Sequence, residues 1–271
     1  MVSTPSSSTS SPSPAPWLWD DGDYAVTARD LHRLSVEAVR RAGPQSGQPV
    51  LDLGTGTGNA ALLAARTGAR VTGVDLADRL LEEARGRAAD AGLAIDFVHG
   101  DLHALPFADG SFDVALSVSA AVLVPGARQT AHELVRVLRP GGHAVVVGWH
   151  EDSILGRLST HFPVVSPELI AEDPGWYSPD RVERLFAPHP VTVAVEEIPF
   201  GFEAAGEDEL VARMTGTHPV LVDARARLDD DAWDAVADGL RATIHEHARP
   251  TDDGGVRLPA RCLVVEILKD A

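Results

Sequence analysis

Short apolar segments alternate with amphipathic stretches through the first half of the chain. The apolar segments have the near-continuous hydrophobic character of strands buried on both faces, and we expect strands at 49–53, 70–75, 94–99, 112–118 and 143–148. The amphipathic stretches repeat apolar residues every three or four positions, which predicts helices at 24–42, 59–67, 78–91 and 129–138. Strands that alternate with helices predict an α/β fold, with a mostly parallel sheet covered by helices on both faces.

Residues that favour helix ends accompany these stretches. Asp78 is expected to cap the third helix, and Gly92 is expected to close it. The sequence Pro140-Gly141-Gly142 is expected to end the fourth helix before the next strand begins.

The second half of the chain has a less regular pattern. Helices are expected at 153–162 and 180–187, and strands at 191–202 and 256–268 are expected to pair antiparallel. Between those strands, 203–250 contains two or three predicted helices, of which 230–248 is the clearest. Because insertions of this size usually pack over one end of a sheet, we expect a helical cap from insertions at about 151–189 and 203–250.

The composition indicates a globular protein with a disordered start. Of the 271 residues, 44% are hydrophobic, which suits one α/β domain with insertions, and we expect that domain at 17–271. Residues 1–16 are mostly Ser, Thr, Pro and Ala, and we expect a disordered tail there rather than a secretion signal. No apolar run approaches the ~20 residues that span a bilayer, and Cys262 is the only cysteine, so we expect a cytoplasmic protein.

The formal net charge of −17 changes which partners are expected. Sequence-independent binding to nucleic acid needs a basic surface, so we expect no nucleic-acid partner and no membrane partner. A small-molecule substrate is expected instead, and nothing in the sequence indicates an oligomeric state. His245 and His247 lie two positions apart on a predicted helix and point to different faces, so we expect no metal site there.

Candidate chemistry begins where the first predicted strand ends, in the sequence V-L-D-L-G-T-G-T-G at 50–58. Gly54 and Gly56 lack a Cβ, so their backbone N–H groups can approach a ligand closely and the turn can adopt positive φ angles. Asp75 ends the second strand, 17 residues beyond Gly58, where a carboxylate can accept hydrogen bonds from both hydroxyls of a ribose. Each feature alone is often structural, but their order along the chain favours a nucleoside-bearing cofactor.

Further strand ends extend the same candidate site. Asp101 follows the third strand in H-G-D-L, where it could accept from the exocyclic amine of an adenine ring, with Leu76 and Leu102 covering the faces of that ring. Ser117 ends the fourth strand, where a reacting group would lie. His150 follows the fifth strand and is the candidate for a base that touches substrate; otherwise the catalytic residues are unknown.

Five blocks of the sequence resemble the class I S-adenosylmethionine (SAM) dependent methyltransferases, in particular the branch that contains ubiquinone- and menaquinone-type C-methyltransferases and many natural-product methyltransferases. The blocks are V-L-D-L-G-T-G-T-G, V-T-G-V-D, H-G-D-L, L-P-F-A-D-G-S-F-D-V-A-L-S and E-L-V-R-V-L-R-P-G-G. The resemblance covers about 24–148 closely. It implies SAM as the cofactor and a Rossmann-like sheet of seven strands, with the strand at 256–268 as the antiparallel last strand.

The resemblance also implies roles for individual residues. The residues expected to contact the cofactor are Asp52, Gly54, Thr55, Gly56, Asp75, Leu76, Asp101, Leu102 and Ser117. Of these, the backbone from Asp52 to Gly56 would hold the methionine part of SAM, Asp75 the ribose, and Asp101 the adenine. The implied activity is transfer of a methyl group to the O, C or N atom of a small, hydrophobic organic acceptor.

The chain departs from the family pattern after the fourth strand. The sequence A-V-L-V-P at 121–125 lacks the His residues that related chains often carry there. The sequence L-S-V-S-A at 116–120 lacks the Asn/Asp-Pro-Pro-Tyr/Phe block that accompanies methyl transfer to adenine or to protein glutamine. A SAM-binding protein that transfers no methyl group therefore stays an alternative, and a nicotinamide-dependent oxidoreductase is a further one.

Overall fold

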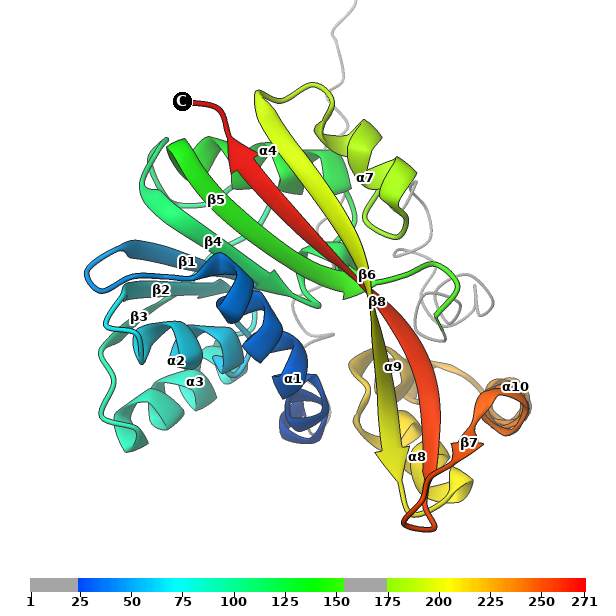
Figure 1. Ribbon diagram of the computed structural model, residues 1–271. Coiled ribbons are helices and arrows are strands. Elements are labelled where there is room, and N and C mark those ends of the chain that lie inside the picture. The colour runs from blue at the N-terminus through cyan, green and yellow to red at the C-terminus, as the bar shows by residue number, and fades with distance from the viewer. Residues whose placement is uncertain (1–23, 154–174) are drawn as a thin grey trace, which may run out of the picture.

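A sheet of eight strands forms the centre of the protein in the computed structural model, which describes residues 24–153 and 175–271 (Figure 1). The strands are β1 (Pro49–Leu53), β2 (Arg70–Asp75), β3 (Ile95–His99), β4 (Phe112–Val118), β5 (Leu138–Trp149), β6 (Val191–Ala204), β7 (Arg249–Pro250) and β8 (Val256–Lys269). Their order is β3-β2-β1-β4-β5-β8-β6, and β7 pairs with β8. Strands β1 to β5 are parallel, and β8 is antiparallel between β5 and β6. The predicted Rossmann-like fold is confirmed, with the short β7 added to the expected seven strands.

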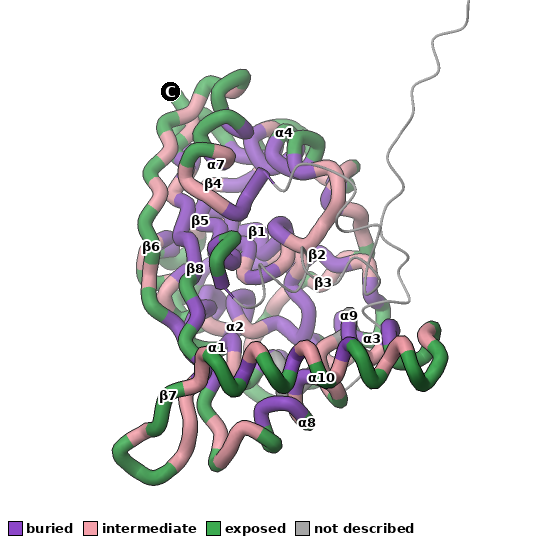
Figure 2. The backbone as a smooth tube through the Cα atoms, turned by 90° about the vertical axis from the view of Figure 1, so that its right-hand side faces the viewer, coloured by how far each residue is buried: buried purple, intermediate pink, exposed green. Residues whose placement is uncertain are grey.

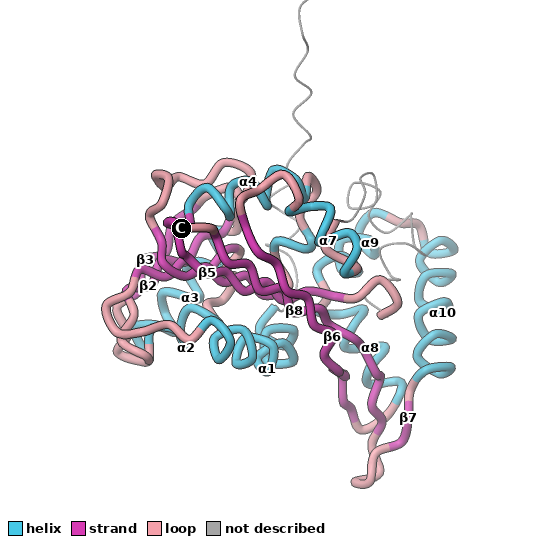
Figure 3. The backbone as a smooth tube through the Cα atoms, turned by 45° about the horizontal axis from the view of Figure 1, so that its top comes forward, coloured by secondary structure: helices cyan, strands magenta, loops and turns pink. Residues whose placement is uncertain are grey.

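Helices cover both faces of this sheet. They are α1 (Tyr24–Ala42), α2 (Asn59–Ala65), α3 (Asp78–Asp90), the short 3-10 helix η2 (Ala121–Leu123), α4 (Ala127–Val137), α7 (Pro179–Phe186), α8 (Glu207–Thr217), α9 (Pro219–Arg227) and α10 (Asp230–His247). Figure 3 shows α1, α2 and α3 on one face and α4 and α7 on the other. The core lies along the central strands, where Leu51, Leu116 and Val145 are fully buried, while exposed residues are frequent on α10 and along the edge strand β6 (Figure 2).

Two predicted boundaries are wrong. The N-cap of α3 is Ala77, and Asp78 is the first helical residue, without a capping role. Helix α4 ends at Val137, and β5 begins at the next residue instead of at His143. The Pro-Gly-Gly sequence lies within β5 as an irregularity in the β4 pairing, because Gly141 adopts a φ of 72° that lets the strand bulge.

The remaining predicted elements of the first half agree with the structure to within a few residues. The predicted tail at 1–16 lies outside the described residues, as does all but the first residue of the helix predicted at 153–162. None of the described helices has the length and apolar character needed to cross a membrane.

A two-stranded ribbon carries the helices of the second half. Strands β6 and β8 pair along their full length, from Val191 opposite Lys269 to Ala204 opposite Val256, whereas the pairing of β5 with β8 stops at Trp149. Because β5 is parallel to β1 and β4, the unshared part of the ribbon extends beyond the carboxyl ends of the parallel strands (Figure 1). Helices α8, α9 and α10 follow one another between its two strands, and we call them the cap.

Candidate functional site

The turn after β1 lies at the carboxyl edge of the sheet and requires glycine. Gly54, Gly56 and Gly58 have φ angles of 63°, 52° and 85°. These angles lie in the left-handed region, which side chains with a Cβ rarely adopt. At Gly54 there is also no room, because an added Cβ would lie closer than 3.0 Å to the Cβ of Ala120. The turn from β1 therefore packs directly against the segment that follows β4.

The side chain of Asp52 stabilises this turn through hydrogen bonds. Its carboxylate Oδ2 accepts hydrogen bonds from the Thr55 hydroxyl at 2.8 Å and from the Ala61 backbone N–H at 3.0 Å. The residue is 2% exposed, and burial raises the pKa of its carboxyl to about 7, with a smaller contribution from the charge of Asp75. Asp52 thus links the turn to the first residues of α2.

Asp75, at the end of β2, is buried against the same turn. Its Oδ2 accepts from the Gly56 N–H at 2.8 Å, and its Oδ1 accepts from the Ala77 N–H at 3.0 Å. The structure therefore brings together the glycine turn and the strand-end carboxylate that the sequence singled out. These two hydrogen bonds hold the carboxylate in one orientation at the edge of the sheet.

Asp101, just after β3, is more open than Asp75. Its side chain is 32% exposed, and its Oδ1 accepts from the His103 N–H at 2.9 Å and lies 3.1 Å from His103 Nδ1. The other ring nitrogen of His103 contacts the carbonyl oxygen of Pro125, so this histidine joins the loops after β3 and β4. Sequence reasoning missed His103. Leu102 beside it is buried, and Leu76 is half-buried.

Two serines at the end of β4 differ in their surroundings. Ser117 is buried, donates to the Leu53 carbonyl at 3.0 Å and accepts from the Ala121 N–H at 3.1 Å, so its hydroxyl joins β4 to β1 and η2. Ser119 has a φ of 52°, and it is the one non-glycine residue with positive φ in the described chain. Its Oγ is buried without a hydrogen-bond partner among the described residues. No sequence signal separates the two serines, and Ser119 was missed.

His150 follows β5 and makes its contacts along the ribbon. The Asp152 N–H donates to His150 Nδ1 at 3.1 Å, and His150 Nε2 lies 3.6 Å from Glu197 Oε1 on β6. In this arrangement Nδ1 is used as a hydrogen-bond acceptor. The ring is 9% exposed. His150 therefore lies in a polar cluster with Asp152 and Glu197, beside the ribbon.

Aromatic rings lie where the ribbon leaves the sheet, and the cap contains a histidine whose Nδ1 is buried. Trp149 at the end of β5 packs edge-on against Phe200 of the ribbon, with ring centroids 5.6 Å apart. At the junction of α8 and α9, His218 Nδ1 is sealed from solvent and has no partner among the described residues. Burial lowers the pKa of His218 to about 4, so its ring is neutral near pH 7.

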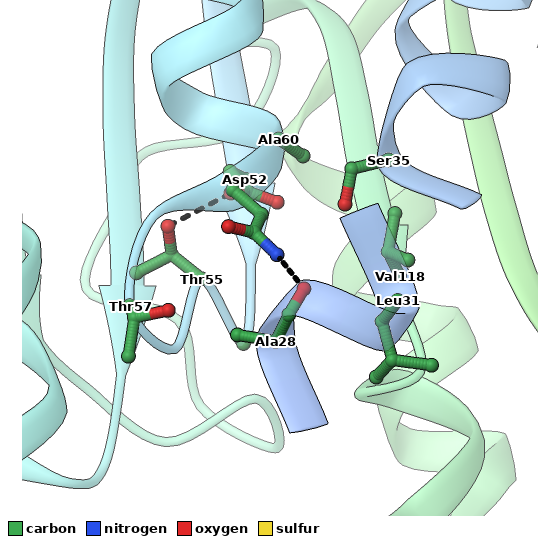
Figure 4. Close-up of a pocket in the computed structure, with 10 residues that line it drawn as sticks. Ala28, Leu31, Ser35, Asp52, Thr55, Thr57, Ala60 and Val118 are labelled. Carbon is green, nitrogen blue, oxygen red and sulfur yellow. Dashed lines mark hydrogen bonds between the residues drawn. The ribbon is translucent and has the colours of Figure 1, made fainter. Parts of the chain in front are cut away.

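A small pocket lies between α1 and the glycine turn (Figure 4). Its lining residues come from α1, the β1 turn, α2 and β4: Ala28, Leu31, Ser35, Asp52, Gly54, Thr55, Thr57, Asn59, Ala60 and Val118. Its volume of about 30 Å³ is enough for roughly one water molecule. The Asn59 side-chain amide donates to the Ala28 carbonyl at 2.7 Å and holds α1 over the turn.

The predicted cofactor residues therefore fall into separate groups. Asp52, Gly54 and Thr55 line the pocket, and Asp75 is hydrogen-bonded to the turn through Gly56. The lining does not include Asp101, Leu102, Ser117 or His150. This pocket therefore takes in only the part of the edge that the glycine turn forms with α1.

Sequence comparison shows that part of this chain is similar to methyltransferases. Residues 50–142 match a family model described as a methyltransferase domain. An uncharacterized protein of Mycobacterium tuberculosis (strain ATCC 25618 / H37Rv) is 38% identical over 176 residues, which are 64% of this chain and 64% of that protein. The methyltransferase GfsG of Streptomyces halstedii is 38% identical over 117 residues, 42% of each chain.

Solved structures share the fold at low sequence identity. The YcgJ protein from Bacillus subtilis superposes with a TM-score of 0.64 and 20% identity, covering 89% of this chain and 99% of that one. The Haemonchus contortus phosphoethanolamine N-methyltransferase 2 in complex with S-adenosyl-L-methionine has a TM-score of 0.58 and 19% identity, covering 88% of this chain and 53% of that one. Residues 50–142 are thus similar to a methyltransferase domain, and the described fold is shared with these solved structures.

Proposed function

We propose that the protein transfers a methyl group from SAM to the O, C or N atom of a small, hydrophobic organic acceptor. The observation that carries this proposal is the contact of the glycine turn with the Asp75 carboxylate at the carboxyl edge of a methyltransferase fold. An acidic chain and small-molecule chemistry also favour a cytoplasmic enzyme without nucleic-acid or membrane partners.

The residues at this edge fit the parts of SAM in strand order. The backbone from Gly54 to Gly56 would hold the methionine part, Asp75 the ribose hydroxyls, and Asp101 the adenine amine. When bound, SAM would supply a methyl group already activated by a positively charged sulfur. Asp75 suits its role because two backbone N–H groups fix its carboxylate before a ligand arrives.

The acceptor side supports a largely apolar molecule. Trp149, Phe200 and Phe202 form a cluster of rings where the ribbon leaves the sheet. His150, the base candidate, is held by Asp152 and faces Glu197, which favours catalysis by alignment and exclusion of water over proton removal by this histidine.

Calorimetry with SAM and with its product S-adenosylhomocysteine tests the proposal. We expect both to bind the wild type, and Asp75→Asn to weaken binding roughly ten- to a hundredfold, because the amide replaces one charged acceptor with a donor. Asp96→Asn is the matched control, since Asp96 is exposed in the neighbouring strand β3. Thermal melting of both variants checks that they remain folded.

Three results would contradict the proposal in different ways. No binding at millimolar ligand removes SAM as the cofactor, and tight NADH binding in its place favours a nicotinamide-dependent oxidoreductase. Binding without methylated product across a panel of phenols, amines and activated carbon acids favours a SAM-binding protein that transfers no methyl group.

A further inference from the structure

We infer that Ser119 is a binding residue for the amino-acid end of the cofactor, through its side-chain hydroxyl. The inference rests on the proposed function and adds a contact that the motif pattern does not supply. It starts from two unusual properties of this one residue, its backbone angle and its unpaired hydroxyl.

The backbone of Ser119 is held in an unfavourable conformation. A φ of 52° brings the Cβ of an L-residue close to the following carbonyl, so the surroundings must enforce it. They do so on both sides: the Ser119 N–H donates to the Val147 carbonyl of β5 at 2.8 Å, and the next residue, Ala120, packs against Gly54. Strain of this kind concentrates at functional sites.

The hydroxyl of Ser119 has no partner in the described fold. The residue is 4% exposed, and its Oγ is sealed from solvent. Buried hydroxyls are almost always hydrogen-bonded, and leaving one unpaired is destabilising. Ser117, two residues earlier, has both a donor and an acceptor partner. The fold thus provides hydrogen-bond partners for the hydroxyl of Ser117 but none for the hydroxyl of Ser119. We infer that a bound ligand provides the partner of Ser119.

The position of Ser119 indicates which part of the cofactor that group belongs to. Along the edge the strands follow the order β3, β2, β1, β4. Adenine at Asp101 and ribose at Asp75 occupy the ends of β3 and β2, so the rest of an extended cofactor would run over β1 towards β4. Neighbouring strands are about 4.8 Å apart, which puts Ser119 two strand spacings beyond Asp75. Its neighbour Val118 lines the pocket under α1.

The amino-acid end of the cofactor also has the right chemistry. It carries an ammonium and a carboxylate, and a serine hydroxyl can accept from the first or donate to the second. Charge-assisted hydrogen bonds of this kind are stronger than neutral ones. An apolar acceptor would leave the hydroxyl unpaired.

Two ligands and three variants test this inference. S-adenosylhomocysteine has the amino-acid end, and 5′-methylthioadenosine lacks it. In calorimetry we expect Ser119→Ala and Ser119→Gly to weaken S-adenosylhomocysteine binding roughly ten- to a hundredfold and to leave 5′-methylthioadenosine binding unchanged. Ser119→Gly also relaxes the backbone, so its melting temperature should equal or exceed that of the wild type. Ser111→Ala, on the turn before β4 at the opposite edge, is the control and should change neither affinity.

The possible results separate this inference from the proposed function. Unchanged S-adenosylhomocysteine affinity in Ser119→Ala overturns the inference, and so does an equal loss for both ligands, which indicates general distortion of the edge. A variant that keeps its affinity for S-adenosylhomocysteine but loses turnover assigns Ser119 to the acceptor instead, and it overturns the inference too. If the wild type binds neither ligand, the proposed function fails first.

Discussion

Replacement of Gly54 by alanine should destabilise the protein in two separable ways. An alanine at a φ of 63° costs about 1–2 kcal/mol in backbone energy. The added methyl group would also overlap the Ala120 side chain, and overpacking of a buried contact costs about 1–3 kcal/mol. We therefore expect Gly54→Ala to lower the free energy of unfolding by about 2–5 kcal/mol.

Two further variants separate these contributions. Gly92 has a φ of 66° and no atom within 4 Å of an added Cβ, so Gly92→Ala carries the backbone cost alone, about 1–2 kcal/mol. Adding Ala120→Gly to Gly54→Ala removes the overlapping methyl group and should recover the packing contribution.

Urea unfolding followed by circular dichroism measures each free energy by linear extrapolation. The reasoning would be refuted if Gly54→Ala cost no more than Gly92→Ala. It would also be refuted if Ala120→Gly brought no recovery in the double variant. Either result would mean that the β1 turn does not press against the segment after β4.

The remaining predictions concern two buried groups. Because burial raises the pKa of Asp52 from 3.8 to about 7, the folded state keeps a proton that the unfolded chain releases, and its stabilising effect is lost as pH rises from about 4 to 7. Relative to Asp52→Asn, the wild type should lose up to about 4 kcal/mol of unfolding free energy across that range; parallel pH profiles in urea titrations would contradict this. Cys262 is fully buried, and burial raises the pKa of its thiol to about 12, so a thiol reagent should label native protein at least about a hundredfold more slowly than protein in concentrated urea. Equal labelling rates would show that β8 is open in the native state.

The local pattern was sufficient to predict most of the sheet. Strands β1, β2 and β4 match their expected bounds because each is a largely buried apolar run that ends in, or is directly followed by, Gly or a polar residue. The boundary between α4 and β5 was not predictable in this way, since Pro140, Gly141 and Gly142 favour a loop when considered alone. In the structure these three residues have no register partner on β4 or β8. The residues on either side, Leu138 and His143, both pair with β4, so the strand continues through the irregular segment.

Only the part of the site that is formed by the sequence motifs could be predicted. The order of the motifs brought Gly56 and Asp75 together correctly, because strand ends of a parallel sheet meet at one edge. The difference between Ser117 and Ser119 depends on backbone angles and on partners from β1, β5 and η2. The contacts of His150 likewise depend on β6, which lies far along the chain. No single-sequence pattern encodes such long-range neighbours.

The ribbon places the two ends of the cap insertion side by side. Ala204 and Val256 are direct register partners in an antiparallel pair, and such partners have Cα atoms only about 4.5–5.5 Å apart. A replacement segment of any length can bridge that gap without redirecting either strand. The cap insertion can therefore differ in length or sequence without altering the pairing of β6 with β8.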